Sequence, residues 1–191
     1  MIVVLLGPPG AGKGTQAKLI AKNNNLFHFS TGNILREEVE NKTEIGKIIE
    51  SIINAGQLVS DDIIISIVDK IISKELSQHK GILFDGFPRN LDQANSLDNL
   101  LINKKKEINF VIHLSIDKGE VIKRIKKRKQ EENRDDDNVS VLESRIHVYL
   151  KETRPLIDLY KNKNILEKVD GIKSIDEVNK NINKIFLKTN S

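Results

Sequence analysis

The residue types best suited to chemistry lie near the start of the chain, which reads Gly7-Pro8-Pro9-Gly10-Ala11-Gly12-Lys13-Gly14-Thr15. The apolar run Ile2–Leu6 precedes this stretch, and a helical spacing of Ala17, Ile20 and Ala21 follows it. Glycines let successive backbone N–H groups turn onto one anion, while a lysine adds a point charge and the helix N-terminus favours the same anion. The G-x-x-x-x-G-K spacing therefore predicts a phosphate-binding loop.

A second candidate group follows another apolar run, Ile82–Phe84, and reads Asp85-Gly86-Phe87-Pro88-Arg89. An acidic residue at the end of a strand, on the edge that holds the phosphate loop, suits a direct or water-mediated hold on Mg²⁺. The planar guanidinium of Arg89 suits pairs of phosphate oxygens. Both residues are therefore candidates for phosphoryl chemistry.

Arginines in the second half of the chain form a third candidate group. An enzyme that moves a phosphoryl group between two anions must neutralise several charges and exclude water, and arginines on a closing segment do both. Arg124 and Arg128 are four residues apart and share a helix face. Arg134 and Arg145 flank the acidic run Asp135–Asp137, whose members Asp136 and Asp137 are expected to orient guanidiniums.

The elements that must position these residues follow from short apolar runs alternating with amphipathic stretches. Such alternation predicts an α/β fold in three layers, with a five-stranded parallel sheet between helices on both faces. Ligands then bind at the edge where the strands end. A helix with Ile63, Ile67, Val68, Ile71 and Ile72 on one face is expected after the cap Ser60-Asp61. The expected strands are Ile2–Leu6, Leu26–Phe29, Gly81–Phe84, Phe110–Ile116 and Ile165–Val169.

Two inserts are expected on this single phosphate-loop domain. Residues 30–59 hold two helical patterns and no strand, and they end in the connector Ala55–Val59, as a helical flap over the active edge would. Arg36 lies one turn after the helix start at Thr31 and Gly32, within reach of an anion there. A short polar lid occupies residues 129–138. The core is then residues 1–29, 60–128 and 139–191.

Composition limits the function classes. The chain has 191 residues, 30% of them charged and 38% hydrophobic, and no cysteine, which excludes disulfides and thiolate zinc sites. It has no apolar run of about 18 residues and no secretory signal, so no membrane span and a cytoplasmic location are expected. The net charge of +4 and the basic runs Lys104–Lys106 and Lys123–Lys129 raise the question of nucleic acid. Interspersed acids and the lack of neighbouring aromatics argue against it.

The motifs together resemble the nucleoside monophosphate kinases, and the adenylate kinases most closely. Gly14 stands where most phosphate-loop proteins carry a Ser or Thr for Mg²⁺, and the hydroxyl comes one place later at Thr15. The string Asp85–Arg89 is the signature of the monophosphate kinases, and motifs continue in order from Ile2 to about Lys184. The resemblance implies MgATP + AMP ⇌ 2 ADP by direct in-line transfer, in nucleotide salvage and energy homeostasis. It also implies a monomer that acts on free ATP, AMP and ADP.

The resemblance assigns residues to each substrate. The residues implied for AMP are Thr31, Gly32, Arg36, Gln57, Leu58, Val59, Gly86, Phe87, Pro88, Arg89, Gln93, Arg134 and Arg145. Those implied for ATP are Gly10, Ala11, Gly12, Lys13, Gly14, Thr15, Arg124, Arg128 and Lys173. The catalytic set is Lys13, Asp85, Arg89, Arg128, Arg134 and Arg145. Mg²⁺ is expected to be held by the nucleotide phosphates, with Asp85 outside its direct ligands, and not in a dedicated protein site.

Three further features of the sequence bear on the candidate site. Family members usually carry Asp where this chain has Asn33, which puts a role of that position in Mg²⁺ hydration in doubt. The lid matches the short type, for which no zinc is expected. The four histidines, His28, His79, His113 and His147, show no ligand spacing and are expected to be bystanders.

Two alternatives stay open. A UMP/CMP kinase is suggested by Pro88-Arg89-Asn90, but Thr31 and Gln93 oppose it, because pyrimidine enzymes usually carry Ala and Asn there. A Gln amide can accept from the exocyclic amine of adenine and donate to a ring nitrogen. The other alternative is a non-catalytic or nucleic-acid-linked nucleotide-binding protein. It is opposed by the presence of Lys13, Asp85 and the lid arginines.

Overall fold

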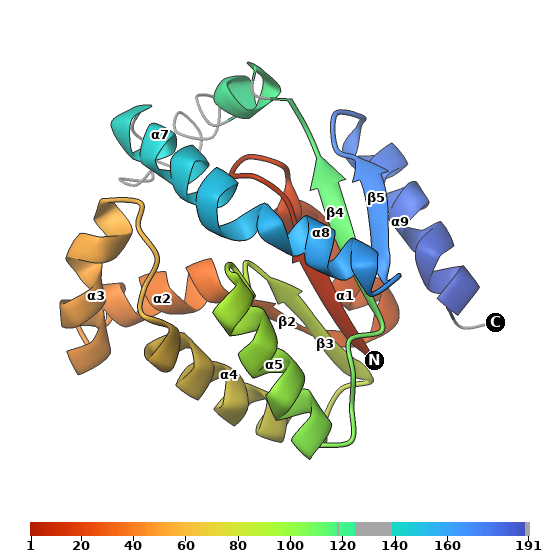
Figure 1. Ribbon diagram of the computed structural model, residues 1–191, viewed down its shortest axis with the longest axis horizontal. Coiled ribbons are helices and arrows are strands. Elements are labelled where there is room, and N and C mark those ends of the chain that lie inside the picture. Colours follow the sequence, from red (N-terminus) through yellow and green to blue (C-terminus); the bar gives the residue numbers. More distant parts are fainter. Residues whose placement is uncertain (118, 125–138, 190–191) are drawn as a thin grey trace.

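The computed structural model describes residues 1–117, 119–124 and 139–189, along which strands and helices alternate (Figure 1). The strand order is β2-β3-β1-β4-β5, and every pairing between neighbours is parallel. This confirms the predicted five-stranded parallel sheet, and each predicted run overlaps its strand. The strands are β1 (Ile2–Leu6), β2 (Leu26–Ser30), β3 (Gly81–Asp85), β4 (Phe110–Ser115) and β5 (Leu166–Asp170).

Helices connect the strands. They are α1 (Lys13–Asn24), α2 (Thr31–Glu40), α3 (Glu44–Asn54), α4 (Asp61–Glu75), α5 (Leu91–Asn103), α7 (Val139–Val148), α8 (Pro155–Asn162) and α9 (Ile175–Thr189). Residues 119–124 are also helical. A π-helical turn, η2 (Tyr149–Thr153), joins α7 to α8. The expected lid, residues 129–138, lies outside the described residues.

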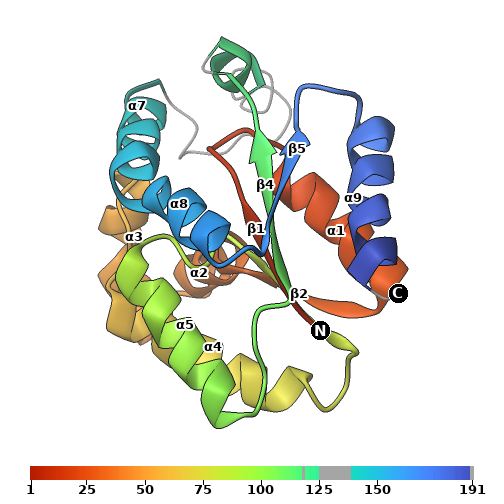
Figure 2. The same cartoon turned by 45° about the vertical axis from the view of Figure 1, so that its right-hand side comes forward.

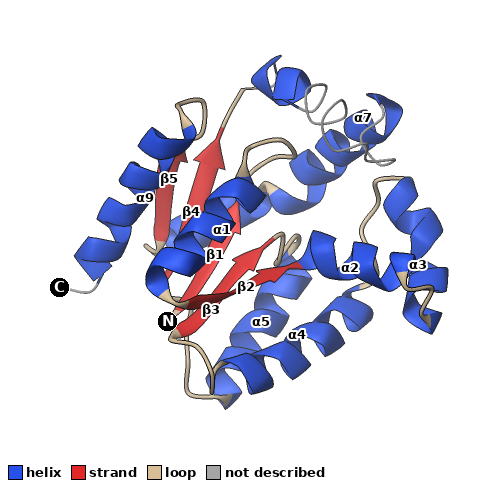
Figure 3. Cartoon of the chain, turned by 180° about the vertical axis from the view of Figure 1, so that it is seen from behind, coloured by secondary structure: helices blue, strands red, loops and turns tan. Residues whose placement is uncertain are grey.

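Both faces of the sheet are covered (Figures 2 and 3). Val3 and Leu5 of β1 point to the face packed by α1 and α9, while Ile2 and Val4 point to the face packed by α4, α5 and α8. Successive strand residues alternate between faces, so a fully apolar strand such as β1 needs both covers. Because all strands run the same way, their ends meet at one edge.

Helix α4 buries the predicted stripe, with one addition. Val68 and Ile72 are almost fully buried as predicted, and so is Ile64, which the prediction omitted. The predicted Ile63, Ile67 and Ile71 are partly buried against the same core cluster. The helix is apolar on a wide arc and contacts both β3 and α5, so packing selects the centre of the stripe. Ser60 precedes α4 as predicted but makes no side-chain capping bond.

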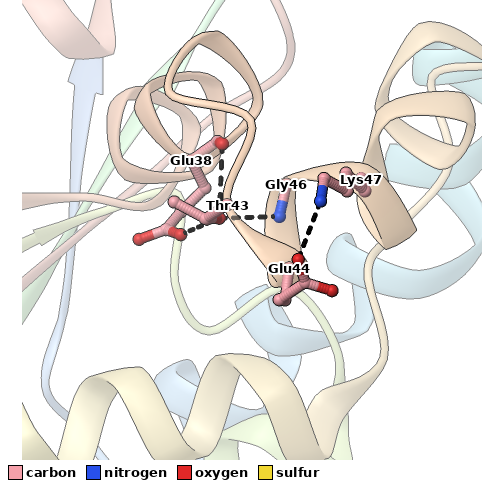
Figure 4. A network of polar contacts seen from close by, with 5 residues as sticks. All are labelled: Glu38, Thr43, Glu44, Gly46 and Lys47. Carbon is pink, nitrogen blue, oxygen red and sulfur yellow. Dashed lines mark hydrogen bonds and ion pairs between the residues drawn. The ribbon is translucent and has the colours of Figure 1, made fainter.

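Helices α2 and α3 form a pair beside the sheet, within residues 30–59 (Figure 1). Thr43 caps α3 by accepting from the Gly46 N–H at 2.9 Å, and its hydroxyl donates to the Glu38 carboxylate of α2 (Figure 4). A Cβ at Gly46 would lie 2.0 Å from the Glu38 carbonyl oxygen. The two helices therefore pack backbone to backbone at Gly46.

Among the described residues no helix is long and apolar enough to cross a membrane.

Candidate active site

A cleft of about 980 Å³ opens at the edge where the strands end. Its volume lies near the top of the roughly 300–1,000 Å³ range of small-molecule sites. Predicted residues from distant parts of the sequence meet there. They are Gly10, Ala11, Gly12, Lys13, Gly14, Thr15, Thr31, Gly32, Arg36, Gln57, Leu58, Val59, Asp85, Gly86, Pro88, Arg89, Gln93, Arg124, Arg145 and Lys173.

The phosphate loop forms one wall of the cleft. Gly10 (φ 79°) and Gly12 (φ 85°) take left-handed backbone conformations that L side chains rarely adopt, and α1 begins at Lys13. The Lys13 ammonium donates to the carbonyls of Gly7 at 2.7 Å and Pro8 at 3.0 Å. No acidic residue stands in the first turn of α1, so the helix N-terminus keeps its preference for an anion. The local geometry is that of a phosphate cradle.

Asp85, at the end of β3, lies against this loop. The carboxylate is buried, and a Cβ at Gly14 would lie 3.7 Å from Asp85 Oδ2. A carboxylate beside a phosphate loop suits Mg²⁺ that arrives with a nucleotide. Among the described residues, no group of three or more His, Cys, Asp or Glu side chains could hold a metal ion by itself.

His28 of β2, one of the four histidines expected to be bystanders, lies beside Asp85. Its Nε2 atom lies 3.3 Å from Asp85 Oδ2, and the residue lines the cleft. The parallel β2–β3 pairing brings the two elements together. A lone histidine in a strand gives no ligand spacing, so this pairing could be found only once the strand order was known.

The Gly86 carbonyl joins the helical insert to the arginine of the same turn. It accepts from the Thr31 hydroxyl at 3.0 Å and from Arg89 Nε at 2.7 Å. The Thr153 hydroxyl of η2 donates to the Arg89 carbonyl at 2.7 Å. Arg89 is thereby held by its own turn and by η2, and it shares the Gly86 carbonyl with Thr31.

The cationic groups around Arg89 make this part of the cleft strongly electropositive. Burial lowers the pKa of Arg89, the neighbouring Arg145 and Arg36 lower it further, and Asp85 opposes them. An arginine stays charged despite such a shift, so these guanidiniums converge at a cost in repulsion that a bound anion would relieve. Arg36 folds back beside Gly32 and donates to Asn33 Oδ1 at 2.7 Å.

Gln93 of α5 lies deeper, with 2% of its surface exposed. Its Oε1 atom accepts from the Arg89 backbone N–H at 2.7 Å, and its Nε2 atom donates to Asp61 Oδ1 at 2.7 Å. Asn90 caps α5 by accepting from the Gln93 N–H at 2.7 Å. Asn90, part of the Pro88-Arg89-Asn90 string that suggested a UMP/CMP kinase, thus has a structural role as a helix cap.

Arg124 and the loop after β5 lie beside the phosphate loop, where a Cβ at Gly12 would be 3.9 Å from Arg124 Nη1. Arg124 Nη2 donates to the Ile172 carbonyl at 3.2 Å, and Arg124 Nε donates to Glu120 at 2.7 Å. The Gly171 N–H donates to the Ser115 carbonyl at 2.9 Å, which ties this loop to β4. Arg124 and Lys173 therefore share one side of the cleft with the phosphate loop.

The connector after α3 touches α7. Ser144 donates to the Ala55 carbonyl at 3.0 Å and accepts from Gln57 Nε2 at 2.8 Å. A Cβ at Gly56 would lie 3.0 Å from the Val141 carbonyl oxygen, so the backbones are in close contact. Arg145, next along α7, thereby stands near the AMP-assigned connector.

Phe87 differs from the other predicted site residues in the described ranges, because it does not line the cleft. The Phe87 side chain is fully buried and packs against Phe29 and Phe84 in the core, so its side chain does not face a ligand. Arg128 and Arg134 lie outside the described residues, as do Asp136 and Asp137. Sequence reasoning missed three cleft or supporting residues: His28, Asp61 and Ser144. Asp61 had a signal, because it follows Ser60, but it was interpreted only as part of a helix cap.

Comparison with known proteins decides the family. The sequence model described as "Adenylate kinase" matches residues 5–165. The chain belongs to the adenylate kinase family. Curated adenylate kinases that resemble it include one from a strain of Prochlorococcus marinus, 46% identical over 94% of this chain and 95% of the relative. Another from Parvibaculum lavamentivorans is 43% identical over 97% of this chain and 92% of the relative. Membership of the adenylate kinase family makes the chain a nucleotide-binding phosphotransferase and disfavours the alternatives.

Proposed function

We propose that this chain transfers the terminal phosphoryl group of ATP to AMP, giving two ADP, and that the reaction is reversible. The observation that carries the proposal is the continuous cleft that joins the phosphate loop to Arg36, Arg89 and Arg145. One anion would occupy the loop and a second would face the arginines. The reacting oxygen of AMP is already a nucleophile, so no strong base is required.

The donor is assigned to the phosphate-loop side. Backbone N–H groups and Lys13 would hold the ATP phosphates, with Arg124 and Lys173 beside them. The acceptor is assigned to the insert side. Thr31, Arg36, the connector Gln57–Val59, Arg89, Gln93 and Arg145 would hold AMP, without the side chain of Phe87. Arg128 and Arg134 remain assigned by resemblance alone.

Catalysis would come from positioning and from neutralising charge on the migrating phosphoryl group. Lys13 and Arg89 would contact it from two sides. Mg²⁺ bound with ATP would add positive charge at the phosphate oxygens. Asp85 fits this ion because its buried carboxylate lies beside Gly14. A monomer acting in the cytoplasm on free nucleotides completes the proposal.

A panel of acceptors tests it. ATP is supplied with AMP, UMP, CMP or GMP, and the diphosphates formed are separated and quantified. AMP should be preferred over UMP and CMP by at least ~10²-fold in kcat/KM, because several buried polar contacts would be mispaired. Comparable turnover of CMP would favour a UMP/CMP kinase instead. Nucleotide binding without turnover would favour a non-catalytic protein.

A further inference from the structure

The side-chain amide of Gln93 has a fixed polarity. A backbone N–H can only donate, so the amide oxygen must face Arg89 N, 2.7 Å away. A carboxylate can only accept, so the amide nitrogen must face Asp61 Oδ1, also 2.7 Å away. Turning the amide over would set two donors against each other at Arg89 and two acceptors at Asp61. The orientation therefore follows from the chemistry of the two partners.

The amide oxygen and the amide nitrogen of Gln93 can each form one more hydrogen bond. A carboxamide oxygen has two lone pairs and its nitrogen carries two protons, and the contacts described use one of each. Gln93 also lines the cleft. The remaining lone pair and proton can meet a ligand edge that offers a donor beside an acceptor, without loss of either protein contact.

Asp61 is held in place by a second donor. Asn90 Nδ2 lies 3.1 Å from both carboxylate oxygens of Asp61. Asn90 is itself the cap of α5, so the start of α4 and the start of α5 are joined through this carboxylate. The carboxylate thus meets the Gln93 amide from a position set by two helices.

We propose that Asp61 is a positioning residue that sets the base specificity of the acceptor site for 6-aminopurines over 6-oxopurines, by fixing the polarity of the Gln93 amide. An adenine edge offers a donor at its 6-amino group and an acceptor at N1. Hypoxanthine, with a 6-oxo group and a protonated N1, offers the reverse pattern. An amide that cannot turn over pairs with the first and opposes the second. The inference deepens the proposed function and rests on it.

The test compares AMP with IMP as acceptor. These nucleotides differ only at the 6-position and at the N1 proton, so sugar and phosphate contacts cancel in the ratio of kcat/KM values. Asp61→Asn replaces one acceptor oxygen with a donor and keeps the shape, which lets the Gln93 amide turn over. The ratio should fall by about tenfold, part of it through a lower KM for IMP, because a reversed bidentate pair becomes available. Arg89 N–H still favours the original orientation, so discrimination is reduced and not abolished.

The matched control is Asp62→Asn, which removes the same charge from the same first turn of α4 at an exposed position. It should leave the AMP to IMP ratio unchanged. Asp61→Ser, with a hydroxyl that can donate or accept, is a second variant and should move the ratio in the same direction as Asp61→Asn. Thermal unfolding of each variant identifies any that fail to fold.

Gln93→Leu distinguishes a failure of the role proposed for Asp61 from a failure of the proposed acceptor site. If it abolishes the preference for AMP over IMP while both folded Asp61 variants keep the wild-type ratio, the inference about Asp61 is overturned and the acceptor assignment stands. If Gln93→Leu itself leaves the ratio unchanged, Gln93 does not read the base and the proposed acceptor site is wrong at this position. The proposal is supported if the ratio of the kcat/KM values for AMP and IMP falls in both Asp61 variants and keeps its wild-type value in Asp62→Asn.

Discussion

His28 Nε2 and Asp85 Oδ2 lie 3.3 Å apart at neighbouring strands, beside the phosphate loop. The carboxylate lies close to Gly14, so its orientation would determine how it meets the metal ion that we propose arrives with ATP. An imidazole partner limits the rotation of such a carboxylate. His28 is therefore expected to support the metal through Asp85.

His28→Gln tests this support. Loss of the imidazole should raise the Mg²⁺ concentration needed for half-maximal activity by about tenfold, the lower end of the effect of partners to metal-binding groups. The measurement is activity against free Mg²⁺ at saturating nucleotide. His147→Gln, at an exposed position on α7, is the control and should match the wild type. An unchanged Mg²⁺ dependence in His28→Gln would leave the contact without a role in metal binding.

Substitutions on the ATP side and on the AMP side of the cleft should change the KM of different nucleotides. Arg36→Ala should raise the KM for AMP by ~10-fold or more and spare ATP, whereas Arg124→Ala should do the reverse, because each removes a charged contact to one phosphate group. Steady-state kinetics with each nucleotide varied in turn measures both. The opposite pattern would exchange the two sides of the cleft.

Lys13→Ala should affect the chemical step. The lysine is expected to follow the phosphoryl group as it moves, so its loss should lower kcat by ~10²-fold or more while the KM for AMP changes little. Single-turnover measurement with ATP bound separates chemistry from product release. Near-normal turnover would show that the glycine loop is not a catalytic cradle.

Gly46→Ala should destabilise the helical insert. The added Cβ would fall 2.0 Å from the Glu38 carbonyl oxygen, so α2 and α3 must move apart, at a cost of about 1–3 kcal/mol. The KM for AMP should rise with it, because α2 carries Thr31 and Arg36. Thermal unfolding and AMP kinetics measure the two effects. Ser51→Ala, on an exposed face of α3, is the control and should change neither.

Tyr160→Phe should cost no stability. Tyr160 is fully buried, burial raises the pKa of its hydroxyl, and within the described part of the chain that hydroxyl has no hydrogen-bond partner. Removing it should leave the free energy of unfolding unchanged or raise it by up to about 1 kcal/mol. Tyr160→Ala, by contrast, should lose about 3–5 kcal/mol because the ring fills the core. A clear loss in Tyr160→Phe would reveal a partner for the hydroxyl.

The sheet was predictable because its signal is local. Strands such as β1 and β3 are short apolar runs bounded by turn residues, and the phosphate loop indicates β1 and α1 together. The deep burial of Ile64 in α4 was not predictable, because Ile63 and Ile64 are equally apolar and only packing against β3 and α5 decides which of them is buried more deeply. Local pattern predicts an element, and its neighbours choose its face.

The candidate site divides in the same way. Residues in contiguous motifs, such as Lys13, Asp85 and Arg89, could be predicted as a group because spacing carries their chemistry. His28 and Asp61 could not, because each acts on a residue from another element, and that pairing depends on strand order and on how two helices start. The side chain of Phe87 could not be placed from its motif, because it packs into the core while its neighbours Gly86, Pro88 and Arg89 line the cleft.

The Gly86 carbonyl oxygen accepts hydrogen bonds from both Thr31 and Arg89. Because it is a backbone atom, it is present whatever side chain stands at that position. Point mutation can remove either donor but cannot delete their common acceptor. The one substitution that reaches it is at position 86 itself, where φ is 81° and a Cβ would stand 3.0 Å from Arg89 Nη2. Substitutions can therefore change Thr31 or Arg89 one at a time, whereas the Gly86 carbonyl that accepts from both persists as long as the backbone keeps this fold.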